Sequence, residues 1–219
     1  LSIGLQSVND EELRLLGRIH TYEEFLEAYH LARANGFANI NVDLISAIPG
    51  QTVESWRRTL EQVMALSPEH ISAYSLIVEE GTPFAARKLN LPDEDTEYNM
   101  YEATAQILKE YGFEQYEISN YAKPGFACRH NIGYWKRTDY LGFGPSAASL
   151  FGNRRWTNTA DRSLYLKACG ALEKIREDEE ILSRQDAMEE FMFLGLRMTQ
   201  GISTAEFEEK FGKEIHAVY

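Results

Sequence analysis

The sequence has no apolar run long enough to span a bilayer, and its start does not resemble a signal peptide. Its two cysteines, Cys128 and Cys169, are too few for a disulfide framework and fit a reducing cytosol. Basic residues are also scarce, since 22 Lys and Arg against 34 Asp and Glu give a formal charge of -12. A chain this acidic repels a polyanion, which argues against nucleic acid as a partner. These absences predict a cytoplasmic protein without a membrane segment.

Common catalytic signatures are missing too. The segment YLGFGPSAAS places Gly142 and Gly144 in a G-x-G spacing but lacks the third glycine of a dinucleotide-binding fingerprint. No group of residues has the spacing of a hydrolase triad or a zinc pair. By itself, this glycine-rich segment is best explained as a tight bend between irregular strands.

Up to about residue 80, the chain alternates between strand-like and helix-like patterns. The strand-like runs are SIGLQ, NINVDLIS and HISAYSLIV, and the helical runs are TYEEFLEAYHLARANG and TVESWRRTLEQVMAL. The first of these helices has a capping box from Thr21 to Glu24 and ends at Gly36. Strands that alternate with amphipathic helices predict parallel βαβ units, in which ligands bind at the carboxyl ends of the strands.

The second half of the chain has a less regular pattern. A helix is predicted from about Thr96 to Tyr111, followed by an aromatic- and glycine-rich stretch with a hairpin turn at Gly152–Asn153. From Asp161 onward the pattern is helical, with helix starts at Ser183 and Ser203, and the acidic run EKIREDEEI is interpreted as a helix end or loop. We therefore predict two domains, residues 1–160 and 161–219.

Both ends of the sequence resemble cut ends. The chain opens directly on the strand-like LSIGLQS without an initiator methionine, and it closes on FGKEIHAVY just after a helical pattern. We expect the chain to be part of a longer protein.

Three polar residues stand near predicted strand ends. Gln6 ends the first strand, Arg18 follows the next helical turn, and Asp43 lies within the apolar run NVDLI. A buried, unpaired carboxylate is costly, so Asp43 either makes a structural hydrogen bond or binds a ligand, and the sequence favours neither. The turn at Pro49–Gly50 is explained by its position before a helix capped by Thr52.

The segment CRHNIGYW, residues 128–135, combines a thiol, a guanidinium, an imidazole, an amide and two large aromatic rings. A thiol and an imidazole two residues apart are compatible with a soft metal or haem, or with no ligand at all.

Taken together, SIGLQS, DLISAIPGQT, YEISNYAKPGFACRHNIGYW and YLGFGPSAAS resemble radical SAM proteins of the oxygen-independent coproporphyrinogen III oxidase family, particularly its HemW-type branch. The resemblance implies a partial, six-stranded TIM-like (β/α) barrel followed by a small, mostly helical C-terminal domain. It also implies S-adenosylmethionine (SAM) and a [4Fe-4S] cluster held by a C-x-x-x-C-x-x-C loop. This chain has no such loop and resembles the family from about the fourth barrel strand onward. We expect the chain alone to bind no cluster and to cleave no SAM.

The resemblance also assigns residues to two ligands. Its SAM-binding positions fall on Gln6, Arg18, Asp43, Ile77 and Ala148. Its H-N-x-x-Y-W haem signature falls on His130, Asn131, Tyr134 and Trp135, with His130 as the ligand of the haem iron.

Two neighbours extend this assignment. If the segment is extended, Cys128 shares a face with His130, and Arg129 is placed to meet a haem propionate. In the alternative interpretation, His130 and Asn131 cap a turn and the aromatic rings lie in the core.

The resulting hypothesis is a cytoplasmic haem-binding chaperone on a radical SAM scaffold, with haem-accepting apoproteins as possible partners. The rival is a true coproporphyrinogen III oxidase, which decarboxylates two propionates. A third hypothesis makes the C-terminal helices an interaction module resembling a winged helix, for which the acidity argues against DNA as a target.

Overall fold

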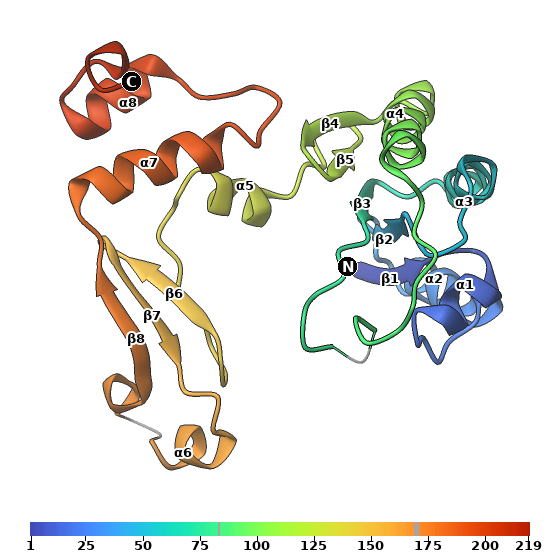
Figure 1. Ribbon diagram of the computed structural model, residues 1–219, viewed down its shortest axis with the longest axis horizontal. Coiled ribbons are helices and arrows are strands. Elements are labelled where there is room, and N and C mark those ends of the chain that lie inside the picture. The colour runs from blue at the N-terminus through green and yellow to red at the C-terminus, as the bar shows by residue number, and fades with distance from the viewer. Residues whose placement is uncertain (83, 169–170) are drawn as a thin grey trace. The chain divides into compact units, whose positions relative to one another are not determined.

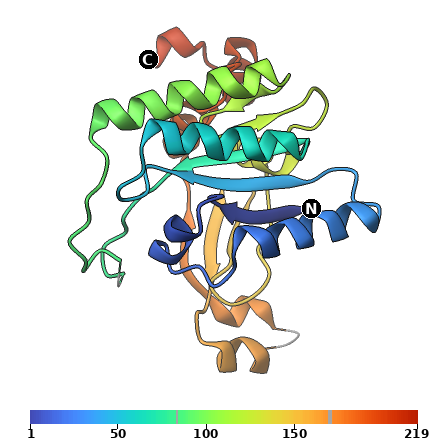
Figure 2. The same cartoon turned by 90° about the vertical axis from the view of Figure 1, so that its right-hand side faces the viewer.

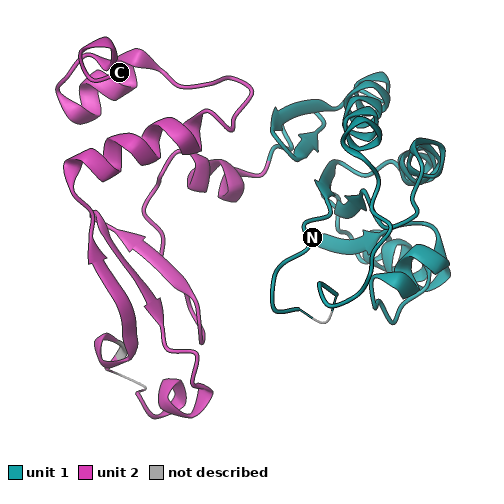
Figure 3. Ribbon diagram, in the orientation of Figure 1, with its two compact units in different colours: residues 1–127 teal, residues 128–219 magenta. Residues whose placement is uncertain are grey.

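A computed structural model of the chain describes residues 1–82, 84–168 and 171–219. These residues form two compact units, residues 1–127 and residues 128–219 (Figure 3). The domain boundary predicted near residue 160 lies within the second unit and stays a prediction, because compactness alone does not define a domain that folds independently. Cys169 lies outside the described residues. No helix in the described ranges is long and apolar enough to cross a bilayer.

The first unit is built from a five-stranded sheet and helices that follow its strands (Figure 1). Its strands are β1 (Ser2–Gln6), β2 (Asn41–Ser46), β3 (His70–Ser75), β4 (Glu114–Glu117) and β5 (Asn120–Ala122). Its helices are α1 (Asp10–Leu15), α2 (Tyr22–Ala34), α3 (Val53–Ala65) and α4 (Glu94–Glu110).

The strand order is β1-β2-β3-β5-β4, and β1, β2 and β3 are parallel. Ser2 pairs with Asn41 and Asn41 with His70, which places these residues in one row across the sheet. The predicted parallel βαβ units are therefore confirmed. β5 and β4 extend the sheet in the antiparallel direction beyond β3.

One face of this sheet packs against the hydrophobic core. In β2, Val42 and Leu44 are fully buried while Asn41 and Asp43 on the opposite face are half-buried, as strand alternation requires. Helices α2, α3 and α4 cover the apolar face, and Figure 2 shows α3 and α4 lying side by side. The indole Nε1 of the fully buried Trp56 in α3 donates to Thr104 Oγ1 in α4 at 2.8 Å, which satisfies a polar atom inside this apolar layer.

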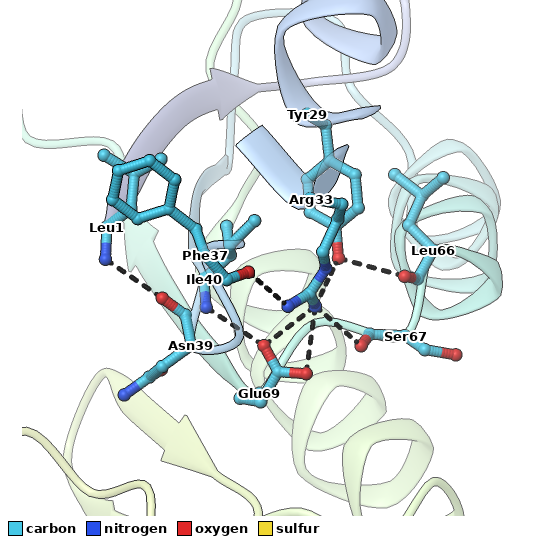
Figure 4. Close-up of polar contacts among 9 residues, drawn as sticks. All are labelled: Leu1, Tyr29, Arg33, Phe37, Asn39, Ile40, Leu66, Ser67 and Glu69. Atoms are coloured by element: carbon cyan, nitrogen blue, oxygen red, sulfur yellow. Dashed lines mark hydrogen bonds and ion pairs between the residues drawn. The ribbon is translucent and has the colours of Figure 1, made fainter. Parts of the chain in front are cut away.

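The amino-terminal edge of the parallel strands is held by a group of contacts around Arg33 (Figure 4). Its Nη2 donates to Tyr29 Oη at 2.8 Å and forms an ion pair with Glu69, whose carboxylate accepts the Ile40 backbone N–H at 3.0 Å. Arg33 Nη1 also donates to the Phe37 carbonyl at 3.1 Å. These contacts link the end of α2 to the residues preceding β2 and β3. In βα folds such contacts at the amino-terminal edge stabilise the fold, whereas ligands bind at the opposite edge.

The second unit joins a three-stranded antiparallel sheet to helices. Its strands are β6 (Ala148–Phe151), β7 (Arg154–Asn158) and β8 (Arg176–Ile181). Its helices are α5 (Arg129–Trp135), α6 (Arg162–Lys167), η1 (Leu172–Ile175), α7 (Arg184–Gly195), α8 (Thr204–Phe211) and η2 (Ile215–Ala217). The predicted hairpin turn at Gly152–Asn153 is confirmed, with positive φ angles of 54° and 64° between β6 and β7.

The acidic run EKIREDEEI was expected to be a helix end or loop, and this expectation is wrong for residues 176–181, which form β8. Its pairing with β7 explains the difference, because cross-strand contacts stabilise a sequence with little strand propensity of its own. Arg154 in β7 forms an ion pair with Glu179 at 3.0 Å, and the Arg176 guanidinium lies 4.3 Å from the centre of the Trp156 ring.

The C-terminal helices have a small core of their own. The rings of Phe191, Phe207 and Phe211 contact one another, with centroids 4.8–5.8 Å apart. The predicted helix starts are confirmed: Ser183 forms a capping box with Asp186, and the Ser203 side chain accepts from the Glu206 N–H.

A buried ion-pair group ties α7 to the rest of the second unit. Glu190, whose side chain is 8% exposed, accepts from Arg137 Nε and from Arg155 Nη2, both at 2.6 Å. One carboxylate therefore connects α7 with β7 and with the turn after α5.

Candidate functional site

Gln6 and Gly4 shape the carboxyl end of β1. A register shift separates them, and Gln6 has the unusual φ of 73°, so its side chain folds back along the strand. A Cβ atom at Gly4 would lie 2.7 Å from the Gln6 Nε2. Glycine at this position lets the carboxamide lie there, and a larger residue would displace it. Because Gly4 is the register partner of Asp43, the structure brings the Gln6 amide and the Asp43 carboxylate onto the same part of the sheet.

Asp43 belongs to a polar network on the face opposite the core. Its Oδ1 accepts from Asn41 Nδ2 at 2.7 Å, and its Oδ2 accepts from Ser2 Oγ at 2.8 Å. His70 joins the network through Nδ1, which lies 2.6 Å from Asn41 Oδ1. Burial lowers the pKa of His70 to about 4, so its ring is neutral at neutral pH. Asp43 thus makes structural hydrogen bonds, while each of its oxygens keeps acceptor capacity for a ligand.

Glu12 is a buried residue beside the segments that follow β1 and β2, and its position is not evident from the sequence. It is 8% exposed, and its carboxylate accepts from Ser7 Oγ at 2.6 Å, from Gln51 Nε2 at 2.9 Å and from Ser55 Oγ at 3.3 Å. Glu12 therefore connects the loop after β1 to the loop and helix after β2. A glutamate in the first turn of a short helix has the sequence pattern of a surface residue, so only its spatial partners identify this role.

The two other candidate residues of the first unit lie in loops. Arg18 follows α1 and is exposed, with its backbone N–H bonded to the Leu13 carbonyl at 2.9 Å. Ile77 follows β3 and is 75% exposed. Both positions follow the carboxyl ends of parallel strands, and Gln6 is the last residue of β1. Ala148 lies in β6 of the second unit and is exposed, so its relation to the other four stays a prediction.

The glycine-rich segment near Ala148 is a packed bend. A Cβ at Gly142 would lie 2.2 Å from the Ala148 carbonyl oxygen. Asn158 Nδ2 donates to the carbonyls of Gly142 and Gly144 at 3.2 and 3.0 Å. These contacts support the simple explanation of the two glycines as a tight bend.

The CRHNIGYW segment forms a helix, α5, with Cys128 at its N-cap position. Cys128 and His130 were expected to share a face if the segment were extended. The segment is helical, so this condition does not hold. On a helix, residues four apart share a face, so His130 lies beside Tyr134 and Asn131 lies on the face of Trp135. A helix here satisfies its own backbone groups, which an isolated extended segment cannot do.

His130 and Tyr134 form an exposed aromatic group with Tyr140. The His130 and Tyr134 rings meet edge to face with centroids 4.7 Å apart, as do those of Tyr134 and Tyr140. His130 is exposed and Tyr134 is 38% exposed. The three side chains line a pocket of about 180 Å³ together with Arg129 and Asp139. The imidazole is therefore accessible to a ligand.

Trp135 lies in a different environment. The Arg197 guanidinium is 4.5 Å from the centre of its ring, and the indole lines a second cavity of about 330 Å³ with Phe191 and Met198. Its Nε1 atom is buried without a hydrogen-bond partner in the described part of the chain. The structure therefore brings His130 and Tyr134 together but places Trp135 against the C-terminal helices. Asn131 is half-buried.

Comparison with known proteins places this geometry in a family. Residues 1–63 match the radical SAM superfamily, and residues 182–219 match the HemN C-terminal domain. The heme chaperone HemW of Lactococcus lactis is 38% identical over 100% of this chain and 58% of its own length. That of Bacillus subtilis is 35% identical over 100% of this chain and 59% of its own length. The chain belongs to the HemW-type radical SAM proteins.

A solved structure supports the same fold for this HemW-type chain. The Escherichia coli coproporphyrinogen III oxidase HemN, a radical SAM enzyme, aligns with a TM-score of 0.79 at 25% identity. The alignment covers 97% of this chain and 52% of the HemN chain. The predicted radical SAM fold with a HemN-type C-terminal region is confirmed. The chain spans less than three fifths of the HemW relatives named above, at 58% and 59% of their lengths.

The residues present fit one of the two cofactors that a radical SAM family implies. The Gln6 amide beside Gly4 and the Asp43 carboxylate are a donor and acceptor pair of the kind that can bind the polar groups of SAM. The cluster does not fit, because the chain has no C-x-x-x-C-x-x-C sequence and the described residues include no group of three or more metal-binding side chains.

Proposed function

We propose that this HemW-type chain is part of a haem-binding chaperone on a radical SAM scaffold. The observation that carries the proposal is the exposed pair of His130 and Tyr134 on one face of α5, beside a pocket that Arg129 also lines. An accessible imidazole is a common axial ligand of haem iron, the adjacent rings offer apolar surface to a porphyrin, and a guanidinium can pair with a propionate. The names of the relatives agree with this proposal.

Within this proposal, His130 binds the haem iron and Tyr134 packs against the macrocycle. Asn131 and Trp135 orient α5 from its other face, where Trp135 is packed against Arg197. Haem is the cargo, and haem-accepting apoproteins in the cytoplasm are its recipients.

The same proposal includes a SAM site in the whole protein, made by Gln6, Arg18, Asp43, Ile77 and Ala148. SAM would supply radical chemistry when bound against a reduced cluster. The residues of this chain bind and orient it, with Asp43 accepting from ligand donors and Arg18 pairing with a carboxylate. This chain alone is expected to be inactive.

A coproporphyrinogen III oxidase is the second candidate, and the structural likeness to E. coli HemN favours it. Such an enzyme would convert coproporphyrinogen III to protoporphyrinogen IX once its cluster is reconstituted and reduced. We expect no such product from the whole protein. Its detection would replace the chaperone proposal with the oxidase.

Absorbance titration of the whole protein with haem tests the chaperone proposal. His130→Ala should change the Soret band and weaken haem binding by at least about tenfold, the value of a lost contact of 1.4 kcal/mol. His30→Ala, at an exposed histidine of α2, is the control and should bind as the wild type does. An unchanged Soret band and affinity in His130→Ala would exclude His130 as the iron ligand.

A further inference from the structure

The polar face of the parallel sheet is arranged in two rows. Ser2, Asn41 and His70 are register partners in the first row, and Gly4, Asp43 and Ser72 are partners in the second. The second row is nearer the carboxyl ends of the strands. Because alternate residues of a strand point to the same face, the first row lies directly behind the second as seen from the ligand edge.

Residues of the first row donate hydrogen bonds to the Asp43 carboxylate from the amino-terminal side of the strands. Ser2 Oγ in β1 donates to Oδ2 at 2.8 Å, and Asn41 Nδ2 in β2, the strand of Asp43 itself, donates to Oδ1 at 2.7 Å. Asn41 Nδ2 also lies 2.8 Å from Ser2 Oγ, which joins the two donors to each other. A carboxylate bonded at both oxygens cannot rotate without breaking a contact.

Asn41 is itself fixed by its neighbours. Its Oδ1 lies 2.6 Å from His70 Nδ1 and accepts from Ser72 Oγ at 3.2 Å. His70 and Ser72 are 4% and 3% exposed, so these contacts are shielded from water. His70 Nε2 in turn lies 2.8 Å from Tyr116 Oη. Ser72 Oγ also lies 3.0 Å from Asn41 Nδ2, so the orientation of the amide is set by the other contacts, with its nitrogen toward Asp43 and Ser2 and its oxygen toward the imidazole.

We propose that Ser2 and Asn41 are positioning residues for the ligand contact of Asp43. Each donor uses part of the acceptor capacity of one oxygen and leaves the rest for a ligand, so the ligand group bound there presents hydrogen-bond donors, such as hydroxyl or ammonium groups. This inference rests on the proposed SAM site and deepens it, because it names residues that do not touch the ligand but set its affinity.

A double-mutant cycle on the whole, cluster-reconstituted protein tests the proposal by calorimetric titration with SAM. Asn41→Leu should weaken SAM binding about tenfold and Ser2→Ala about threefold, in line with the loss of a charge-assisted hydrogen bond. In an Asp43→Ala background, both substitutions should change the affinity by less than about twofold, because the group that they position is gone.

Thr104→Val provides the matched control for a merely structural effect. Thr104 is buried, and its substitution removes the hydrogen bond to Trp56 on the core side of the sheet. It should lower the melting temperature and leave SAM affinity unchanged. Ser2 is exposed, so Ser2→Ala keeps the test valid if Asn41→Leu does not fold.

The possible failures are distinguishable. Wild-type protein that binds no SAM would overturn the proposed SAM site and this inference with it. Wild-type binding combined with unchanged affinity in folded Asn41→Leu and Ser2→Ala, or with equal losses in the Asp43→Ala background, would overturn the positioning role alone.

Discussion

The imidazole of His70 bridges two side chains, with Nδ1 2.6 Å from Asn41 Oδ1 and Nε2 2.8 Å from Tyr116 Oη. Because the Asn41 amide nitrogen donates to Asp43 and Ser2, its oxygen faces the ring and can only accept. The ring proton is therefore on Nδ1, and Nε2 accepts from the Tyr116 hydroxyl. A second proton on Nε2 would make the Tyr116 hydroxyl oxygen the acceptor and would place a charge on a buried ring.

This arrangement predicts a loss of stability in mild acid. Burial lowers the pKa of His70 to about 4, whereas the pKa in the unfolded chain is about 6.5. Between these values the unfolded state binds a proton that the folded state does not, so stability decreases as the pH falls through this window, by about 2 kcal/mol between about pH 7 and pH 5. Urea unfolding at both pH values should show a smaller difference for His70→Gln than for the wild type.

His30→Gln is the matched control, because His30 is exposed and lies in α2 of the same unit. It should retain the wild-type pH dependence. Equal pH dependence in His70→Gln and the wild type would mean that His70 is not held neutral.

Glu12→Ala should destabilise the first unit by about 2–4 kcal/mol, because it removes hydrogen bonds to a charged group and leaves the buried Ser7 and Gln51 without their acceptor. Glu11→Ala changes an exposed glutamate in the same helical turn and should cost less than about 0.5 kcal/mol. The midpoint of urea unfolding measures both. Similar midpoints would show that Glu12 does not hold the two loops together.

Glu190→Ala should destabilise the second unit by about 3–5 kcal/mol, because Arg137 would remain buried without its partner. Glu189→Ala alters the neighbouring exposed carboxylate and serves as the control. Hydrogen exchange should locate the lost protection in residues 128–219. A loss confined to residues 1–127 would contradict this assignment.

Arg18→Ala should weaken SAM binding to the whole protein by about 10- to 100-fold, which corresponds to a charge-assisted contact of about 1.5–3 kcal/mol. Arg14→Ala removes another exposed guanidinium, in α1, and should have no effect. Calorimetry provides the affinities. Equal affinities for Arg18→Ala and Arg14→Ala would remove Arg18 from the site.

Periodicity predicted the elements whose stabilising contacts are local. The alternation in NVDLIS gave β2, and the polar residues at 21 and 183 located two helix starts. β8 was missed because its acidic sequence becomes a strand only by pairing with β7, and such a contact leaves no periodic signal. The helix α5 was not predicted, because it lies in a glycine- and aromatic-rich stretch without helical periodicity, and an extended form was considered only as a condition for Cys128 and His130 to share a face.

The candidate site was predicted mainly by family resemblance. Residue chemistry alone left Asp43 undecided between a structural bond and a ligand contact, and the structure shows the structural bonds directly. Ser2, Asn41 and Glu12 could not be identified in advance, since each acquires its role from partners on other strands or helices. The separation of Trp135 from His130 also depended on knowing that α5 is helical.

The position of β1 at the end of the strand order has a consequence for handling residues 1–219 by themselves. Within the described residues β1 pairs only with β2, so its outer side presents backbone N–H and C=O groups without a strand partner. An unprotected edge of this kind is a template for pairing with another chain. The chain of residues 1–219, expressed by itself, would therefore tend to associate edge to edge, and Ser2→Lys should reduce that aggregation.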